Sequence, residues 1–390
     1  MQIREVAIAG YRSLRGIRFP VAPLTVLVGA NGVGKSNLYR ALQLLQATAA
    51  GMLARELAAE GGMQSALWAG RRAAGAPVRI KLAVEMADDS TRGDATRFAY
   101  AVEIGLVPPM GAAFPFEPQV KEEALVQHGG RRPLTLLDRR GPKAWAIDDD
   151  GRKQALGAAL LASETALGAI QDAARCPEID RVRRTMLDWR FYHDLRSDRD
   201  SPLRRPCLAV TTPTLSSDGA DLAAVFATLV HIRGDTADLD AVIDDAFPGA
   251  RLVVPPPERT AAFGLIFPDY PKRVFEAGEL SDGTLRYLAL AGALLGYRLP
   301  GFVALNEPEA SLHPDLLEPL ARLIVRAARR TQIWVVTHSQ PLAQALATQG
   351  GVQPRTVIKR DGETWIEGLR LGGDFADDDE EEAGEDAEGA

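Results

Sequence analysis

Cysteine is nearly absent from this 390-residue chain, which holds only Cys176 and Cys207. Two isolated thiols form no metal-binding or redox pattern, so we expect reduced residues with a packing role. The chain also lacks any run of about 18 apolar residues, so no membrane-spanning helix is predicted. Its first residues, MQIREVAIAGYRSLRG, carry charges where a signal peptide needs an apolar core. We therefore expect a cytoplasmic protein without a membrane partner.

Basic residues are missing from the C-terminal end of the chain. The net charge is −7, but the stretch 374–390 holds ten acidic residues and no basic ones, and the −7 becomes +3 without it. Like charges repel and cannot bury a core, so we expect a disordered, solubilising tail there. The alternative is a tail that competes with nucleic acid for a basic surface.

Sustained heptads are also lacking, which excludes a long coiled-coil arm. What is present is an alternation of apolar strands and amphipathic helices. It predicts an α/β fold with a mixed sheet, an antiparallel β-subdomain and an inserted helical region. Expected strands are 3–8, 24–28, 78–86, 98–104, 124–127, 302–305 and 333–336. Expected helices are 34–50, 153–187, 218–231, 239–247, 281–295, 314–330 and 341–347.

These elements divide into four expected segments. Residues 1–150 form an N-terminal lobe, and 151–235 form a helical, arginine-rich insertion. Residues 236–373 form a C-terminal lobe, and 374–390 form the acidic tail. We interpret the two lobes as halves of one nucleotide-binding fold, with the middle of the chain inserted between them.

A complete phosphate-loop motif, G-x-x-x-x-G-K-[ST], follows the apolar stretch LTVLV and opens a predicted helix. In such a loop, backbone N–H groups and a helix N-terminus surround the phosphates. Lys35 is expected to reach the β- and γ-phosphates of ATP, and the Ser36 hydroxyl is expected to ligate Mg²⁺. The candidate nucleotide-binding residues are Gly29, Ala30, Asn31, Gly32, Val33, Gly34, Lys35, Ser36 and Asn37.

Two further apolar strands end in polar residues. Phe302 to Leu305 is followed by Asn306 and Glu307, and Ile333 to Val336 is followed by Thr337 and His338. Parallel strands deliver such residues to the carboxyl edge of a sheet, where phosphates bind. A glutamate there can polarise the attacking water, and His338 can bond the γ-phosphate.

The stretch Leu280-Ser281-Asp282-Gly283-Thr284 precedes an apolar helix. Ser281 is a good N-cap, and a helix start is one interpretation. An anion site built from the Ser281 hydroxyl and the Gly283 N–H is the other. The order phosphate loop, LSDGT, strand–Glu and strand–His favours the functional interpretation.

Together these motifs resemble those of ABC-type ATPases of the RecF, structural-maintenance-of-chromosomes (SMC) and OLD-like group. The stretch Gly10-Tyr-Arg-Ser13 resembles the N-terminal element of the group, LSDGT its signature, NEPEASLHP its Walker B and D-loop, and VVTHS its switch histidine. The resemblance implies a head-to-tail homodimer that sandwiches each ATP between one phosphate loop and the partner's Ser281–Gly283. It implies Glu307 as general base, His338 as γ-phosphate sensor, and nucleotide contacts from Arg12 and Ser13.

Two departures from the family pattern stand out. Asn306 occupies the usual aspartate position; its carbonyl can still bond a metal-bound water but adds no negative charge, so Mg²⁺ affinity and hydrolysis are expected to be lower. The Q-loop is not identifiable, and Gln64, Gln127 and a substituted residue stay open.

The stretch 181–205 holds eight arginines, with Trp189, Phe191 and Tyr192 among them. Arginines with interleaved aromatics can bind phosphate backbones and stacked bases. Five aspartates in or beside the stretch instead favour a salt-bridged surface. Two functions stay open: an ATP-gated clamp on DNA or another nucleic acid, in repair or defence, and a regulatory or toxin–antitoxin-like ATPase with a separate effector protein. The long insertion between phosphate loop and signature disfavours a transporter subunit.

Overall fold

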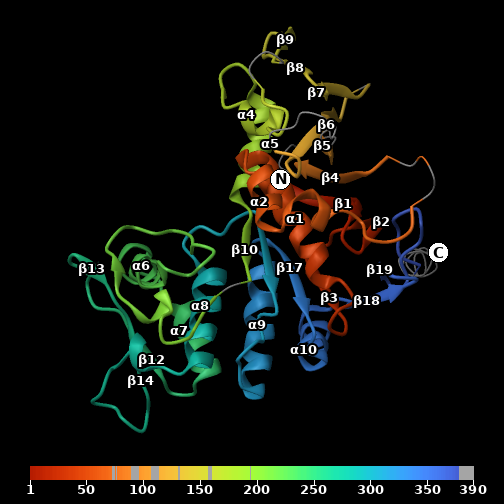
Figure 1. Ribbon diagram of the computed structural model, residues 1–390. Coiled ribbons are helices and arrows are strands. Elements are labelled where there is room, and N and C mark those ends of the chain that lie inside the picture. The colour runs from red at the N-terminus through yellow and green to blue at the C-terminus, as the bar shows by residue number, and fades with distance from the viewer. Residues whose placement is uncertain are drawn as a thin grey trace, which may run out of the picture. The chain divides into compact units, whose positions relative to one another are not determined.

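The chain forms two compact units in the computed structural model (Figure 1). Unit 1 comprises Met1–Ala22, Gly29–Trp189 and Thr356–Ala390, and unit 2 comprises Pro23–Val28 and Arg190–Arg355. No helix in the described part of the chain is both long and apolar enough to cross a bilayer. The residues that the structure describes are 1–72, 75, 77–88, 96–106, 114–130, 132–156, 160–193 and 195–376.

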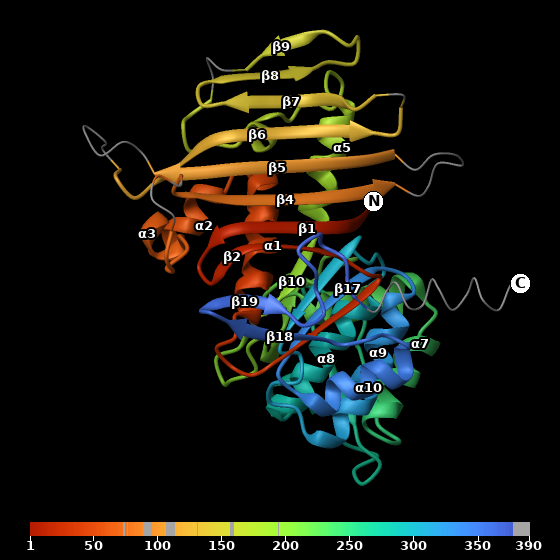
Figure 2. The same ribbon diagram turned by 90° about the vertical axis from the view of Figure 1, so that its right-hand side faces the viewer.

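An eight-stranded antiparallel sheet dominates unit 1 (Figure 2). Its order is β2-β1-β4-β5-β6-β7-β8-β9. In β4, Ile80, Leu82 and Val84 are buried, whereas the residues between them are not, which is the period-2 alternation of a half-buried strand. The strands are β1 (Gln2–Tyr11), β2 (Leu14–Pro20), β4 (Arg79–Asp88), β5 (Thr96–Leu106), β6 (Pro118–His128), β7 (Leu134–Arg140), β8 (Lys143–Ile147) and β9 (Lys153–Ala155).

Helices cover the apolar face of this sheet. Helix α1 packs against β1 and β4, and it buries Leu38, Leu42 and Leu45 on the face predicted from their spacing. The C-terminal strands β18 (Arg355–Arg360) and β19 (Glu363–Ile366) form an antiparallel hairpin. The helices of unit 1 are α1 (Lys35–Ala50), α2 (Leu53–Ala59), α3 (Gly62–Ala66), α4 (Ala166–Ala169) and α5 (Pro177–Asp188).

Unit 2 is built on four parallel strands in the order β10-β16-β17-β3. All four carry buried apolar runs, as expected when both faces of a parallel sheet are covered. These strands are β10 (Arg190–Tyr192), β16 (Phe302–Asn306), β17 (Gln332–Thr337) and β3 (Leu24–Val28). The helices are α6 (Leu222–Thr228), α7 (Ala237–Ala246), α8 (Asp282–Leu295), α9 (Leu317–Ala328) and α10 (Gln340–Gly350).

Short elements complete unit 2. Strand β11 (Cys207–Leu208) pairs with β13 (Thr260–Ala261). Strands β12 (Arg251–Val253), β14 (Gly264–Ile266) and β15 (Phe275–Glu276) form a three-stranded sheet. The remaining single turns are η1 (Pro202–Arg204), η2 (Leu229–Arg233), η3 (Ala277–Glu279) and η4 (Pro314–Leu316).

The mixed α/β class and the antiparallel subdomain are confirmed, but one predicted helix is wrong. Among the described residues of the stretch 153–187 (153–156 and 160–187), only α4 and most of α5 are helical, and Lys153–Ala155 is the edge strand β9. Backbone pairing with β8 overrides the helix propensity of alanine there, and Pro177 sets the start of α5. Within the acidic tail, Phe375 is buried and bridged to Leu369, and residues 377–390 lie outside the described part.

Candidate functional site

The phosphate-loop motif begins directly after β3, and its last two residues, Lys35 and Ser36, are the first two of α1. Gly34 caps the helix with φ 103°, and the first turn of α1 has neither an acidic residue nor a side-chain cap. Neither an acidic residue of the first turn nor a side-chain cap therefore competes with an anion at this helix N-terminus, as an anion site requires. Lys35 is buried, and its Nζ donates hydrogen bonds to Gly29 O at 2.6 Å and Ala30 O at 2.8 Å. Ser36 is exposed.

Glycine is required at two loop positions because the C-terminal hairpin packs against them. A Cβ on Gly29 would lie 2.5 Å from Val357 O, and one on Gly34 would overlap the Thr364 hydroxyl. Gly34 also has the positive φ that other residues rarely adopt. The spacing of these glycines is thus fixed by packing as well as by the phosphates that the loop is suited to hold.

Three linked hydrogen bonds connect α1 to the phosphate loop through Ser13 and Thr364. Asn37 Nδ2 donates to Ser13 Oγ at 2.6 Å, Ser13 Oγ lies 2.6 Å from Thr364 Oγ1, and Thr364 Oγ1 donates to Val33 O at 2.7 Å. Thr364 is buried, and its N–H also donates to Ser13 O. Sequence reasoning missed Thr364 because nothing in its local sequence points to a residue 331 positions earlier.

Arg12 and Ser13 lie beside this chain of hydrogen bonds. The Arg12 guanidinium pairs with the buried carboxylate of Glu60 at 2.7 Å, and Glu60 also accepts from Tyr11 and Arg40. Burial, and next the charge of Glu60, raise the pKa of Tyr11 far above its ordinary range. A hollow of about 700 Å³ is lined by Arg12, Ser13, Arg15, Ser65, Leu67, Trp68, Ala69, Gly70, Arg71, Lys359, Asp361, Gly362 and Glu363.

In unit 2, Asn306 is the last residue of the buried strand β16, one residue beyond the predicted strand end, and Glu307 follows it directly. Glu307 has φ 49°, and this conformation is held from both sides: its N–H donates to Val336 O at 2.7 Å, and Arg286 Nη2 donates to its carbonyl at 3.0 Å. Asn306 Oδ1 is buried and has no hydrogen-bond partner among the described residues. An orphaned amide oxygen of this kind fits a water in the shell of a hard cation such as Mg²⁺.

Glu309 connects the ends of β16 and β17. Its Oε1 accepts hydrogen bonds from the Thr337 hydroxyl and from the N–H groups of His338 and Ser339, both at 3.2 Å. The side chain of Glu309 is 6% exposed. His338 Nδ1 lies 3.4 Å from Glu309 Oε1 and 3.6 Å from Glu307 Oε1. The predicted His338 and Glu307 are thus brought together by a carboxylate that sequence reasoning overlooked, although it stands only two residues after Glu307.

The predicted signature stretch forms the start of α8. Ser281 is its N-cap: its Oγ accepts from Thr284 N at 3.2 Å, and Ser281 and Asp282 are exposed. A Cβ on Gly283 would lie 2.8 Å from Ser311 O, so the signature stretch packs closely on the segment that follows Glu307. One helical turn later, Arg286 reaches the Glu307 carbonyl.

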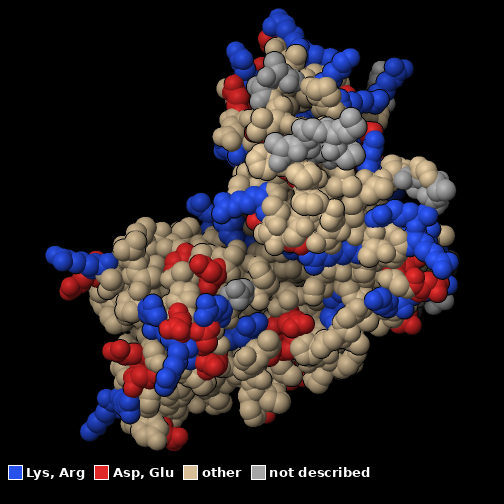
Figure 3. Space-filling view, viewed as in Figure 1, with Lys and Arg blue, Asp and Glu red and all other residues tan. Residues whose placement is uncertain are grey.

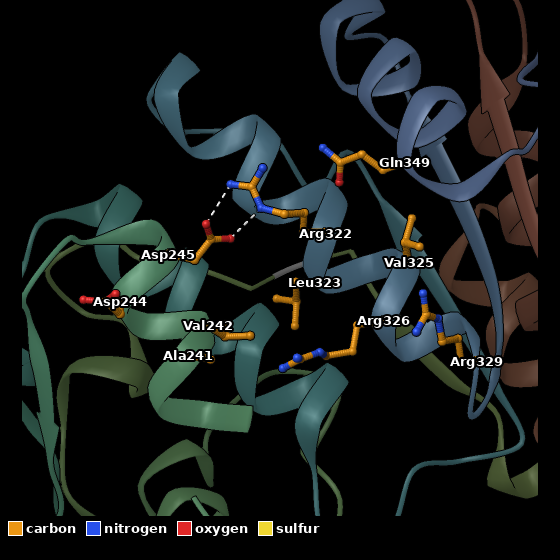
Figure 4. A pocket seen from close by; sticks show the side chains of 10 residues that line it. All are labelled: Ala241, Val242, Asp244, Asp245, Arg322, Leu323, Val325, Arg326, Arg329 and Gln349. Carbon is orange, nitrogen blue, oxygen red and sulfur yellow. Dashed lines mark hydrogen bonds and ion pairs between the residues drawn. The ribbon is translucent and has the colours of Figure 1, made fainter. Parts of the chain in front are cut away.

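A separate hollow of about 840 Å³ lies between α7 and α9 (Figure 4). Arg322 forms two hydrogen bonds of 2.8 Å with Asp245, and Arg326 pairs with Asp238 at 3.2 Å. These pairs neutralise charge between the two helices. None of the predicted site residues lines this hollow.

The arginine-rich stretch 181–205 does not form an open basic surface. Trp189, Phe191 and Tyr192 are all buried and cannot stack on bases. Arg181, Arg183, Arg184, Arg196, Arg204 and Arg205 each have an acidic partner within 4.0 Å. On the visible face of unit 2, basic and acidic side chains alternate (Figure 3). The structure matches the salt-bridged interpretation and corrects the picture of aromatics interleaved for nucleic-acid binding.

The parallel strands and the phosphate loop between β3 and α1 form the fold of an ABC-type ATPase, and this fold is shared with SMC heads. A family model described as "AAA domain, putative AbiEii toxin, Type IV TA system" matches residues 24–158 and 236–343. The chain belongs to this family. No curated protein matches the sequence.

Solved structures of SMC heads share the fold. An Smc head bound to the C-winged helix domain of ScpA is 17% identical, with a TM-score of 0.56 over 95% of this chain and 99% of that one. The SMC head domain from Thermotoga maritima is 15% identical, with a TM-score of 0.50 over 95% and 100%. An Smc head from Pyrococcus furiosus, with an extended coiled coil, is 15% identical, with a TM-score of 0.51 over 95% and 97%.

The position of Glu309 yields a prediction on stability. Glu309→Ala removes the acceptor of the buried Thr337 hydroxyl and of the part-buried N–H groups of His338 and Ser339, of which Ser339 N–H keeps Thr337 Oγ1 at 2.9 Å; a buried donor left unsatisfied costs roughly 1–3 kcal/mol. We expect the free energy of unfolding of unit 2 to fall by at least about 2 kcal/mol, measured by urea denaturation followed with tryptophan fluorescence. Glu318→Ala, at an exposed carboxylate on α9, is the matched control and should change it by less than about 0.5 kcal/mol. Equal effects of the two substitutions would contradict the structural role of Glu309.

Proposed function

We propose that two copies of the chain close head to tail on ATP and hydrolyse it at composite sites. The observation that carries this proposal is the exposed N-terminus of α8. Ser281 and Asp282 are solvent-accessible, so the positive end of this helix lies where an anion can approach it, although Ser281 caps it through Thr284 N–H and Asp282 stands in its first turn. In a head-to-tail dimer, this helix N-terminus would bind the γ-phosphate of the ATP held by the second copy.

In this proposal the phosphate loop holds the β- and γ-phosphates, Arg12 and Ser13 add nucleotide contacts, and Lys35 supplies the positive charge. Ser36, with its exposed hydroxyl, and Asn306, with its orphaned Oδ1, would hold Mg²⁺. When bound, that ion would neutralise charge on the phosphates. The amide of Asn306 brings no negative charge, so we expect a weakly held ion and slow turnover.

Glu307 accepts a proton from the attacking water, and His338 bonds the γ-phosphate. The support is geometric: Glu307 is held at φ 49° by two backbone hydrogen bonds, and its carboxylate lies 3.6 Å from His338 Nδ1. Fixing the backbone on both sides lowers the reorganisation needed during the reaction. The outward turn of Glu307 leaves its carboxylate 37% exposed and within reach of water.

The role of Lys35 is tested by Lys35→Ala. We expect nucleotide binding to be lost, because the only cation inside the loop is removed. Isothermal titration calorimetry with ATP and Mg²⁺ measures this, and circular dichroism checks that the fold is retained. Unchanged ATP affinity in a folded variant would refute the assignment of the phosphate loop.

The composite site is tested by Glu307→Gln. This variant should bind ATP but lack the base, so the closed dimer should accumulate and double the mass seen by light scattering. Ser281→Arg in the same background should keep ATP binding by the monomer and prevent dimer formation by bulk and charge. A Glu307→Gln variant that stays monomeric with ATP, beside a parent whose specific activity is independent of protein concentration, would rule out the model.

The target of the ATPase cycle is proposed to be a separate effector protein. Burial of the three aromatics and pairing of six arginines remove the main sequence argument for a nucleic-acid surface. The family description, which names a toxin–antitoxin system, fits a protein effector. Repair or defence through DNA binding is the competing role.

Binding of purified protein to labelled DNA, with and without ATP and across salt, separates these roles. We expect no ATP-dependent binding at 0.15 M salt, because binding through phosphates needs unpaired cations and falls steeply with salt. ATP-stimulated binding with a steep salt dependence would favour the nucleic-acid role instead.

A further inference from the structure

Arg204 contacts the signature stretch with most of its guanidinium. Nη1 donates to Gly278 O at 3.2 Å and to Leu280 O at 2.8 Å, and Nη2 donates to Asp282 Oδ1 at 2.5 Å. Nε donates to the carbonyls of Ser197 and Asp198 at 2.9 and 3.0 Å. The side chain is only 13% exposed. A planar fork with five donors can satisfy this set, which the single ammonium of a lysine cannot.

The support behind Arg204 is rigid. It is the last residue of η1, which Ser201 caps by accepting from Leu203 N at 3.1 Å. Ser201 and Leu203 are fully or almost fully buried. On the other side, η3 carries a capping box between Glu276 and Glu279. Arg204 therefore connects η1 with η3, the short turn that directly precedes the signature stretch.

Arg204 compensates the negative charge of Asp282, the carboxylate with which it pairs in the same chain. Asp282 is the first residue of α8, and its side chain is 58% exposed beside the Ser281 N-cap. A carboxylate there stabilises the helix but repels any phosphate that approaches the same N-terminus. Arg204 holds this carboxylate at 2.5 Å and compensates its charge.

We propose that Arg204 is a positioning residue that presets the signature stretch for the partner's ATP. It fixes the Leu280 carbonyl, and with it the Ser281 N-cap, and it cancels the repulsion between Asp282 and the γ-phosphate. The inference rests on the composite site proposed above. It also replaces the sequence-based interpretation of Arg204 as a nucleic-acid contact, since its donors are already used.

The first test uses Arg204→Met in the Glu307→Gln background. ATP affinity of the monomer should stay at the parent value, because the phosphate loop is unaltered. The protein concentration needed for half-maximal ATP-driven dimer formation should rise by roughly tenfold or more. Arg204→Lys, which keeps the charge but loses the fork, should show a smaller rise. Arg205→Met is the matched control, since the side chain of Arg205 is 66% exposed and pairs with Asp200 at 3.7 Å, and it should behave as the parent.

Charge compensation predicts a rescue that a merely structural role would not show. Adding Asp282→Asn to Arg204→Met removes the uncompensated carboxylate and should recover part of the lost dimer formation. If the double variant is no better than Arg204→Met, the electrostatic part of the proposal is overturned. If Arg204→Met and Arg205→Met behave alike, the whole proposal is overturned.

Mixing of impaired variants, at a protein concentration too low for Arg204→Met to dimerise with itself, separates this inference from the composite site itself. A mixture of Lys35→Ala with Ser281→Arg leaves one intact site in each heterodimer, and ATPase activity should return. Lys35→Ala with Arg204→Met should regain activity in the same way, whereas Ser281→Arg with Arg204→Met should not, because both signatures are defective. If activity returns with Lys35→Ala plus Ser281→Arg but not with Lys35→Ala plus Arg204→Met, the role of Arg204 is overturned and the composite site stands. No recovery in the first mixture overturns the composite site.

Discussion

The conformation of the phosphate loop depends on one constraint, which is the close packing of the β18–β19 hairpin against it. Thr364 and Val357 contact the loop so tightly that Gly29 and Gly34 have no room for a side chain. Thr364 is also hydrogen-bonded to Ser13, which in turn accepts a hydrogen bond from Asn37 on α1. Three stretches that are far apart in the sequence therefore hold one loop, which leaves its backbone N–H groups preorganised for phosphate.

At the ends of β16 and β17, the buried carboxylate of Glu309 holds the turn after β17 in place, as the C-terminal hairpin holds the phosphate loop. Glu309 satisfies three donors of the turn that carries His338, and Arg286 and Val336 O fix the backbone of Glu307. The two candidate catalytic residues are thus positioned by hydrogen bonds with neighbouring protein groups. A buried ion or carboxylate that lost these partners would be costly, which couples the integrity of the site to the stability of unit 2.

Charge in this protein is organised mainly by local pairing. Most arginines of the stretch 181–205 have acidic partners, and Arg204 is used to complete the signature stretch. The N-terminus of α8 differs in that its exposed residues, Ser281 and Asp282, include a carboxylate that Arg204 pairs with. This arrangement favours an interaction with one defined phosphate group over diffuse attraction to a polyanion.

The sequence alone determined the phosphate loop, the strand-end Glu307 and His338, the helix start at Ser281 and the α/β class, because each is encoded by residues adjacent in the chain. Strand bounds at Leu24–Val28 and the buried face of α1 followed from short-range periodicity. The edge strand β9 was missed because pairing with β8, not local propensity, decides it. Thr364, Glu309 and Arg204 emerged only from the tertiary structure, since a hydrogen bond to a distant carbonyl or hydroxyl leaves no local pattern. Burial of Trp189, Phe191 and Tyr192 could not be foreseen for a related reason. The local sequence of an aromatic cluster is the same whether the cluster faces solvent or the core, and only long-range packing decides between the two.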